Sequence, residues 1–144
     1  MRYDMKDMKT HTKFLFPASL FILLIGFVLT NSYQFGLCYS DVASQTFDVS
    51  CHSLFEHIGN QIYYGGGALA LVFLVLLFVP QAFKAWKKFA VWFVPLATLL
   101  FIFYPEPGSG DLFAPYPETV YRWVSGAYVL LSLVIIAFAS KVRK

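Results

Sequence analysis

The chain has 144 residues, of which 58% are hydrophobic and 13% are charged, about half the charged fraction that is usual in soluble domains. This composition excludes an ordinary soluble domain and indicates an integral membrane protein. The net charge of +3 does not indicate a nucleic-acid partner, because the Lys and Arg residues lie next to the ends of long apolar segments rather than on one basic face.

Four apolar segments are long enough to cross a bilayer whose hydrocarbon core is about 30 Å thick. We expect membrane spans at about 14–30, 62–79, 89–104 and 123–140, with longer loops at 31–61 and 105–122. The segment 62–79 contains no charged residue. The sequence therefore predicts an all-α membrane protein, in which residues 1–144 form a single integral membrane domain folded as a four-transmembrane-helix bundle.

The basic residues predict the orientation of these spans. Four precede the first span, three lie between the second and third (Lys84, Lys87 and Lys88), and three follow the fourth, whereas the two longer loops hold six of the eight acidic residues. Short connections rich in Lys and Arg remain in the cytoplasm. We therefore expect a multi-pass protein of a plasma or inner membrane with both termini cytoplasmic. The first segment lacks the small-residue cleavage site of a signal peptide, so we expect it to remain as a span.

The loop 31–61 contains two segments with the pattern of short strands. Larger apolar residues alternate with smaller or polar ones over 33–37 and again over 47–51, which predicts an outer β-hairpin. Cys38 and Cys51 are the only cysteines and would face each other across it. An even pair in an exported loop favours a disulfide. The alternative, a catalytic dithiol, lacks the usual Cys-x-x-Cys spacing.

A short amphipathic helix is expected after the hairpin. The residues from Ser53 to Glu56 match a capping box, and Gly59 would redirect the chain into the second span. His52, Glu56 and His57 lie in this region and, with Arg122, are candidates for a polar outer site. Histidines five residues apart on a helix point in different directions, and no third histidine completes a metal site. We therefore expect no metal there.

Small residues make part of the second span nearly smooth. Gly65, Gly66 and Gly67 are followed by Ala70, and Gly126 occupies a similar position in the fourth span. Such residues let helices approach closely in a membrane, so we expect a packing face toward the rest of the bundle or toward a partner. Alternatively, three successive glycines would unwind the helix and line a substrate site, as in transporters with broken helices.

The fourth span begins with Glu118 and Arg122, which are four residues apart and predict a surface ion pair. No Asp, Glu, Lys, Arg or His lies in the interior of a span, which disfavours proton-coupled or ion-coupled transport. The sequence also lacks a phosphate-binding glycine loop, a zinc-protease motif and a nucleophile elbow. We expect neither an enzyme nor a cofactor.

In its predicted layout the chain resembles the claudin-type tetraspan proteins, with a long first outer loop that holds strands and one cysteine pair. Gly36, Leu37, Cys38 and Cys51 are similar to the loop signature of that family. The chain departs from the signature because the tryptophan before the first cysteine is missing and the cysteine spacing is longer. We do not assign it to that family.

These observations predict a small non-enzymatic tetraspan protein that acts as an accessory or structural subunit through its helices and outer loop. Its expected partners are the lipid bilayer and other membrane protein chains or a second copy, and not nucleic acid. One alternative is a small-molecule carrier or pore that uses the Gly65–Gly67 region. A second alternative is an outer-face membrane enzyme at His52, Glu56 and His57.

Overall fold

The computed structural model describes residues 5–38, 40–41, 46–104 and 115–141. Its four long helices are α1 (Met5–Thr30), α2 (Val49–Phe78), α3 (Phe83–Phe103) and α4 (Pro117–Lys141), and a 3-10 turn, η1 (Pro80–Ala82), joins α2 to α3. Two strands of two residues each, β1 (Ser40–Asp41) and β2 (Thr46–Phe47), pair antiparallel before α2. All four helices are long and apolar enough to cross a membrane.

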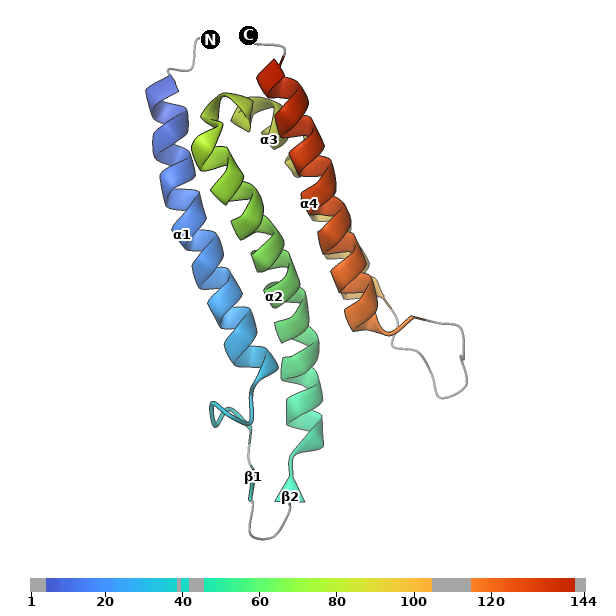
Figure 1. Ribbon diagram of the computed structural model, residues 1–144. Coiled ribbons are helices and arrows are strands. Elements are labelled where there is room, and N and C mark those ends of the chain that lie inside the picture. The colour runs from blue at the N-terminus through green and yellow to red at the C-terminus, as the bar shows by residue number, and fades with distance from the viewer. Residues whose placement is uncertain (1–4, 39, 42–45, 105–114, 142–144) are drawn as a thin grey trace.

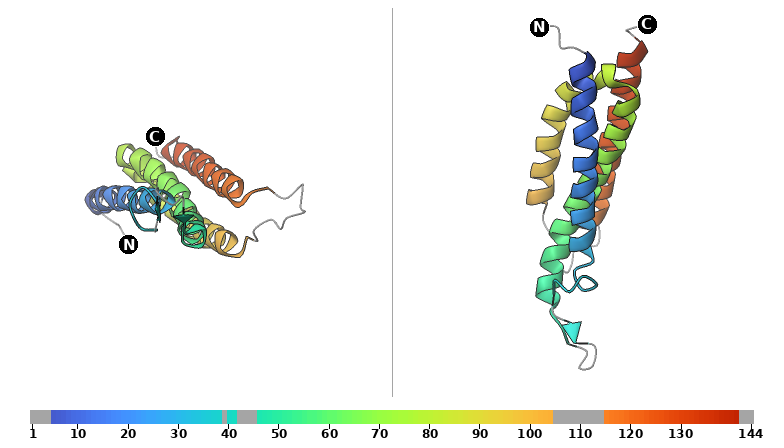
Figure 2. Two further views of the ribbon diagram at one scale, coloured as in Figure 1. Left: turned by 90° about the horizontal axis from the view of Figure 1, so that it is seen from below. Right: turned by 90° about the vertical axis from the view of Figure 1, so that its left-hand side faces the viewer.

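Helix α2 lies in the middle of the arrangement (Figures 1 and 2). It packs against α1 on one side and against α4 on the other, and α3 packs against α4. Helix α1 begins and α4 ends at the same end of the bundle, which we call the termini end. The opposite end, where α2 begins, is called the disulfide end. Lys84, Lys87 and Lys88 at the start of α3 lie near the termini end.

Most of the apolar surface of the helices faces outward. Between 17% and 33% of the most apolar stretch of each helix is buried inside the protein. Large side chains such as Phe21, Leu96 and Phe138 are more than half exposed. A surface of this kind is stable in a bilayer, where exposed apolar side chains contact lipid chains instead of water.

Helix α2 is one continuous helix, so the predicted separate amphipathic helix is wrong. It begins at Val49 because Asp48 caps it, with the Cys51 amide donating to Asp48 Oδ1 at 3.0 Å. Ser53 is not the cap, since its hydroxyl donates to the Ser50 carbonyl within the helix. Gly59 lies inside the helix and is buried. At about 1.5 Å per residue, the 30 residues of α2 span about 45 Å.

The predicted β-hairpin over 33–37 and 47–51 is also wrong. Residues 31–36 form turns that continue from α1, with the Leu37 amide donating to the Ser32 carbonyl at 2.9 Å and Gly36 at a positive φ of 67°. Residues 49–51 form the first turn of α2. Among the described residues, strand pairing is confined to the two residue pairs of β1 and β2. The hydrogen bonds within these turns and the Asp48 cap therefore determine the local structure here, and the alternation of apolar and polar residues does not.

Three glycines set the close packing of α1 on α2. A Cβ atom at Gly26 would overlap the Tyr63 backbone, one at Gly59 would lie 2.6 Å from the Thr30 amide nitrogen, and one at Gly66 would lie 2.9 Å from the Leu23 amide nitrogen. Each contact is with backbone, which cannot move aside as a flexible side chain can. Only glycine therefore fits at these positions.

A second packing region joins α2, α3 and α4 near the termini end. Val72 and Leu76 are fully buried there, and the Phe73 and Trp86 rings pack edge to face at 5.2 Å. Trp86 Nε1 donates to Ser132 Oγ at 3.3 Å, which satisfies the indole of a buried side chain. The region holds α3 and α4 against α2 just below the turn at Pro80.

The glycine contacts generate a prediction that uses one substitution at three sites. Gly26→Ala and Gly66→Ala should each lower the free energy of unfolding by about 1–3 kcal/mol, because the added methyl group collides with α1 or α2 backbone. Gly65→Ala should be neutral or stabilising by up to about 1 kcal/mol, because its Cβ meets nothing within 4 Å and alanine favours the helix. Unfolding in mixed micelles, followed by circular dichroism, measures all three. Equal effects at the three positions would contradict this packing.

Candidate functional site

The predicted disulfide is present and braces the disulfide end of the bundle. Cys38 and Cys51 are bonded, with their Cα atoms 5.8 Å apart. Cys51 lies in the first turn of α2, and Cys38 lies in the segment that follows α1. The bond therefore joins the two ends of the connection between α1 and α2, rather than the two strands of a hairpin. Closing a loop with 13 residues of separation stabilises by about 3 kcal/mol in the chain-entropy model.

His52 belongs to the same brace. Its Nδ1 lies 2.7 Å from Ser32 Oγ, its ring stacks on Tyr33 at 4.2 Å, and its Nε2 lies 3.5 Å from Glu56 Oε2. Tyr33 also donates from its hydroxyl to the Asp48 carbonyl at 3.0 Å. Ser32 is fully buried. These contacts fix the turn after α1 against the first two turns of α2.

His57 lies in a different cluster, which is centred on Gln61. The Gln61 Nε2 atom lies 3.0 Å from His57 Nε2, and it donates to the Phe101 carbonyl at 3.0 Å and to the Tyr121 hydroxyl at 3.1 Å. The Phe101 and Tyr121 rings pack edge to face at 4.7 Å. Gln61 thus connects α2 to both α3 and α4. The signal for this role is a pair of adjacent amides, Asn60 and Gln61, at the start of an apolar span, where lipid offers them no partner.

The candidate polar site of His52, Glu56, His57 and Arg122 is therefore not a single site. His52 pairs with Glu56, and His57 contacts the Gln61 cluster. Arg122 lines a separate groove that is formed by α2 and α4. Within the described ranges, no three His, Cys, Asp or Glu side chains are placed to hold a metal ion. The polar groups at the disulfide end make contacts that hold helices together.

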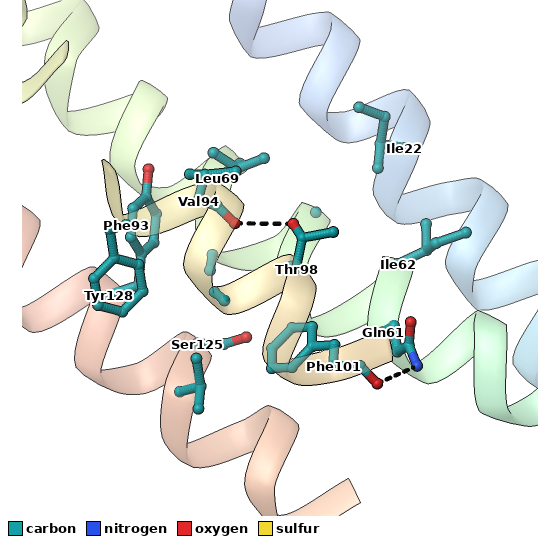
Figure 3. Close-up of a pocket in the computed structure, with 15 residues that line it drawn as sticks. Ile22, Gln61, Ile62, Leu69, Phe93, Val94, Thr98, Phe101, Ser125 and Tyr128 are labelled. Carbon is teal, nitrogen blue, oxygen red and sulfur yellow. Dashed lines mark hydrogen bonds between the residues drawn. The ribbon is translucent and has the colours of Figure 1, made fainter. Parts of the chain in front are cut away.

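A partly open cavity of about 250 Å³, which we call the central cavity, lies between the helices of the bundle. Figure 3 shows Gln61 and the Phe101 carbonyl at one end of it, and Phe93 and Tyr128 together at the other. The cavity exists because small residues form much of its wall. These are Gly65, Gly66, Ala68, Ala97 and Ser125.

The walls of the central cavity decide what it can hold. No charged residue lines it, and the Thr98 hydroxyl donates within α3 to the Val94 carbonyl at 2.9 Å. The cavity therefore suits apolar atoms and offers no groups for acid–base chemistry.

The glycine face divides among three surroundings. Gly66 packs on α1 and also lines the central cavity, Gly65 lines the central cavity alone, and Gly67 and Gly126 line a groove on the other side of the contact between α2 and α4. Ala70 is buried. Helix α2 continues through all three glycines, so they do not unwind the span as the alternative interpretation supposed.

The expected Glu118–Arg122 ion pair does not occur among the described contacts. Glu118 Oε1 instead accepts a hydrogen bond of 2.7 Å from the Tyr64 hydroxyl, which links the start of α4 to α2. The second long loop of the prediction falls mostly on residues 105–114, which lie outside the described residues. Tyr104 donates from its hydroxyl to the Pro115 carbonyl at 3.0 Å, across the two sides of that connection.

Comparisons with protein-family models, with curated proteins and with solved structures found no match to the chain.

The Gln61 cluster generates a second prediction. Gln61→Leu should lower the free energy of unfolding by about 1–2 kcal/mol, because it removes the hydrogen bonds from α2 to α3 and α4. Thr98→Val is the matched control, since the Thr98 hydroxyl bonds only within its own helix. Unfolding in mixed micelles measures the difference. A cost for Thr98→Val as large as that for Gln61→Leu would show that Gln61 does not join the helices.

Proposed function

We propose that the chain is a non-enzymatic multi-pass membrane protein that acts through contacts, as an accessory or structural subunit of a membrane assembly. The observation that carries this proposal is the extension of α2 at the disulfide end. The helix is about 45 Å long and the hydrocarbon core of a bilayer about 30 Å thick. About three turns of α2 therefore project beyond the hydrocarbon when the other helices span it.

The projecting end has the properties of a contact surface. It is held to the segment that follows α1 by the disulfide and by the Ser32–His52 contact, so its shape is fixed before any partner binds. It carries exposed apolar side chains, with Val49 exposed to 69%, Leu54 to 60% and Phe35 to 50%. A rigid end with exposed apolar groups is suited to bury them against another protein chain.

The polar residues support contact rather than catalysis. An enzyme at the disulfide end would need His52, Glu56 and His57 to converge on one substrate. Their side chains instead contact one another or neighbouring helices in two separate clusters. A catalytic base must lie within reach of the proton that it removes. His52 and His57 have different neighbours, so the arrangement does not direct both of them at one substrate.

The distribution of basic residues supports an orientation for this surface. Lys84, Lys87 and Lys88 begin α3 and Lys141 ends α4, all near the termini end. Short connections and chain termini rich in Lys and Arg stay on the cytoplasmic side of a membrane. We propose that the termini end is cytoplasmic and that the braced end of α2 is outside a plasma or inner membrane.

This orientation is testable with an impermeant thiol reagent on intact cells. Leu54→Cys should be labelled and Ala85→Cys should not, because both positions are exposed in the protein but lie at opposite ends. Ala85→Cys should become reactive after the cells are broken, which shows that the site itself is accessible. Labelling of Ala85→Cys but not Leu54→Cys in intact cells would reverse the orientation.

The contact function is testable by site-specific photo-crosslinking in cells. A photoreactive residue at position 54 should give a discrete protein adduct, whose mass distinguishes a second copy from another chain. The same residue at position 134, which is exposed on α4 within the span, should give mainly lipid adducts. Lipid adducts alone at both positions would contradict a protein-contact role for the projecting end.

The central cavity favours a second candidate function, a carrier or binding protein for an apolar small molecule. Gly65→Leu separates the two candidates, because it places a side chain in the cavity and leaves the residues of the projecting end unchanged. Under the contact function, the variant keeps the adduct at position 54. Loss of an extractable apolar molecule or of its passage across vesicles, with the adduct intact, would favour the carrier.

A further inference from the structure

A groove of about 350 Å³ runs beside the contact between α2 and α4, on the side away from the central cavity. We call it the arginine groove. Tyr63, Tyr64 and Arg122 line it toward the disulfide end, and Leu71 and Val129 line it deeper in the bundle. Helices α2 and α4 both run from the disulfide end toward the termini end. The groove is thus polar and cationic at one end and apolar at the other.

The cationic end lies at the level of the membrane surface. Tyr116, just before α4, and Trp123, next to Arg122 on α4, are exposed to 75% and 76%. Exposed Trp and Tyr side chains at the ends of spans mark the boundary between the hydrocarbon and the headgroups. Seven residues separate Arg122 from Val129 and Tyr64 from Leu71, so the apolar part of the groove descends about 10 Å toward the bilayer centre.

Arg122 forms no ion pair within 4 Å with any described residue. The carboxylate four residues before it belongs to Glu118, which accepts a hydrogen bond from Tyr64 instead. The one charged pair found among the described residues is His52 with Glu56. An arginine that forms no ion pair within the described part of the chain, at headgroup depth and beside an apolar groove, is suited to bind a phosphate that carries acyl chains.

The floor of the groove is open enough for an acyl chain. A Cβ atom added at Gly126 would meet nothing within 4 Å, and one at Gly67 would meet only the flexible end of Leu23. Side chains at these two positions would fill the space between the helices. Their absence leaves room below Arg122 where the first part of a chain can lie against protein on both sides.

We propose that the arginine groove binds one glycerophospholipid, with its phosphate at Arg122 and one acyl chain along Gly67 and Gly126. The proposal commits to a lipid rather than a protein helix because of the single cation at the headgroup end. It uses neither the projecting end of α2 nor the central cavity, so it can fail without affecting the contact function.

The test is native mass spectrometry of the delipidated protein, titrated with dioleoyl phosphatidylglycerol, with dioleoylglycerol and with inorganic phosphate. One phosphatidylglycerol should bind per chain, and dioleoylglycerol, which has the same chains without the phosphate, should bind about tenfold more weakly. Inorganic phosphate should not displace the lipid, because it makes no contact with the apolar floor. Displacement by inorganic phosphate would overturn the proposal in favour of a free-anion site.

Matched variants separate the two parts of the groove. Arg122→Gln should weaken phosphatidylglycerol binding about tenfold while Arg122→Lys retains part of it, because Lys keeps the charge but not the paired donors. Gly126→Leu should abolish binding by filling the floor. Lys87→Gln and Ala127→Leu, which are exposed positions outside the groove, should bind as the unchanged protein does.

Three further results would overturn the proposal. The first is equal loss of binding in Lys87→Gln and Arg122→Gln, which would indicate a general charge effect. The second is unchanged binding in both Arg122→Gln and Gly126→Leu. The third is a change of oligomeric state in Gly126→Leu with lipid binding unchanged, which would assign the groove to a helix of another chain. Circular dichroism and melting in detergent confirm that each variant is folded before its lipid binding is compared with that of the unchanged protein.

Discussion

The close approach of α1 and α2 is the contact on which the rest of the structure depends. Lipid tails are as apolar as the helices, so burial of apolar surface does not draw helices together in a bilayer, and van der Waals contact must do so. Gly26, Gly59 and Gly66 provide that contact because each lets backbone meet backbone. The three contacts are distributed along α2 from its middle to its projecting part. The disulfide between Cys38 and Cys51 then secures the pair beyond the last of these glycines.

The two open spaces of the bundle follow from how α2 meets its other neighbours. Helices α2 and α3 meet at the Gln61–Phe101 hydrogen bond and again at the Phe73–Trp86 ring contact, and the central cavity lies between these points. The arginine groove lies on the other side of Ala68 and Ser125, which line both spaces. Small residues therefore have two roles in this protein. Those on the α1 side bring helices together, and those on the α4 side leave volume that surrounding apolar molecules can fill.

The sequence was sufficient to predict the features that depend on composition or on a single pairing. Four apolar segments predict four helices that can span a membrane, and two cysteines in one loop permit only one intramolecular disulfide. The hairpin prediction failed because alternation over 47–51 is a weak signal beside the Asp48 cap, which starts a helix within the same residues. The role of Gln61 and the division among Gly65, Gly66 and Gly67 depend on which neighbour each residue faces. That information comes from the packing of α2 against three other helices and is not present in the local sequence.

The continuity of α2 is the central claim, because the braced projection, the contact function and the placement of both open spaces all require it. A distance between spin-labelled non-natural residues at positions 54 and 71, in lipid nanodiscs with the native disulfide intact, tests it directly. Both positions are exposed, and 17 residues separate them. A continuous helix predicts a narrow distribution centred at about 25 Å. A clearly shorter or broad distribution would show that the chain bends near Gly59, and would contradict the account.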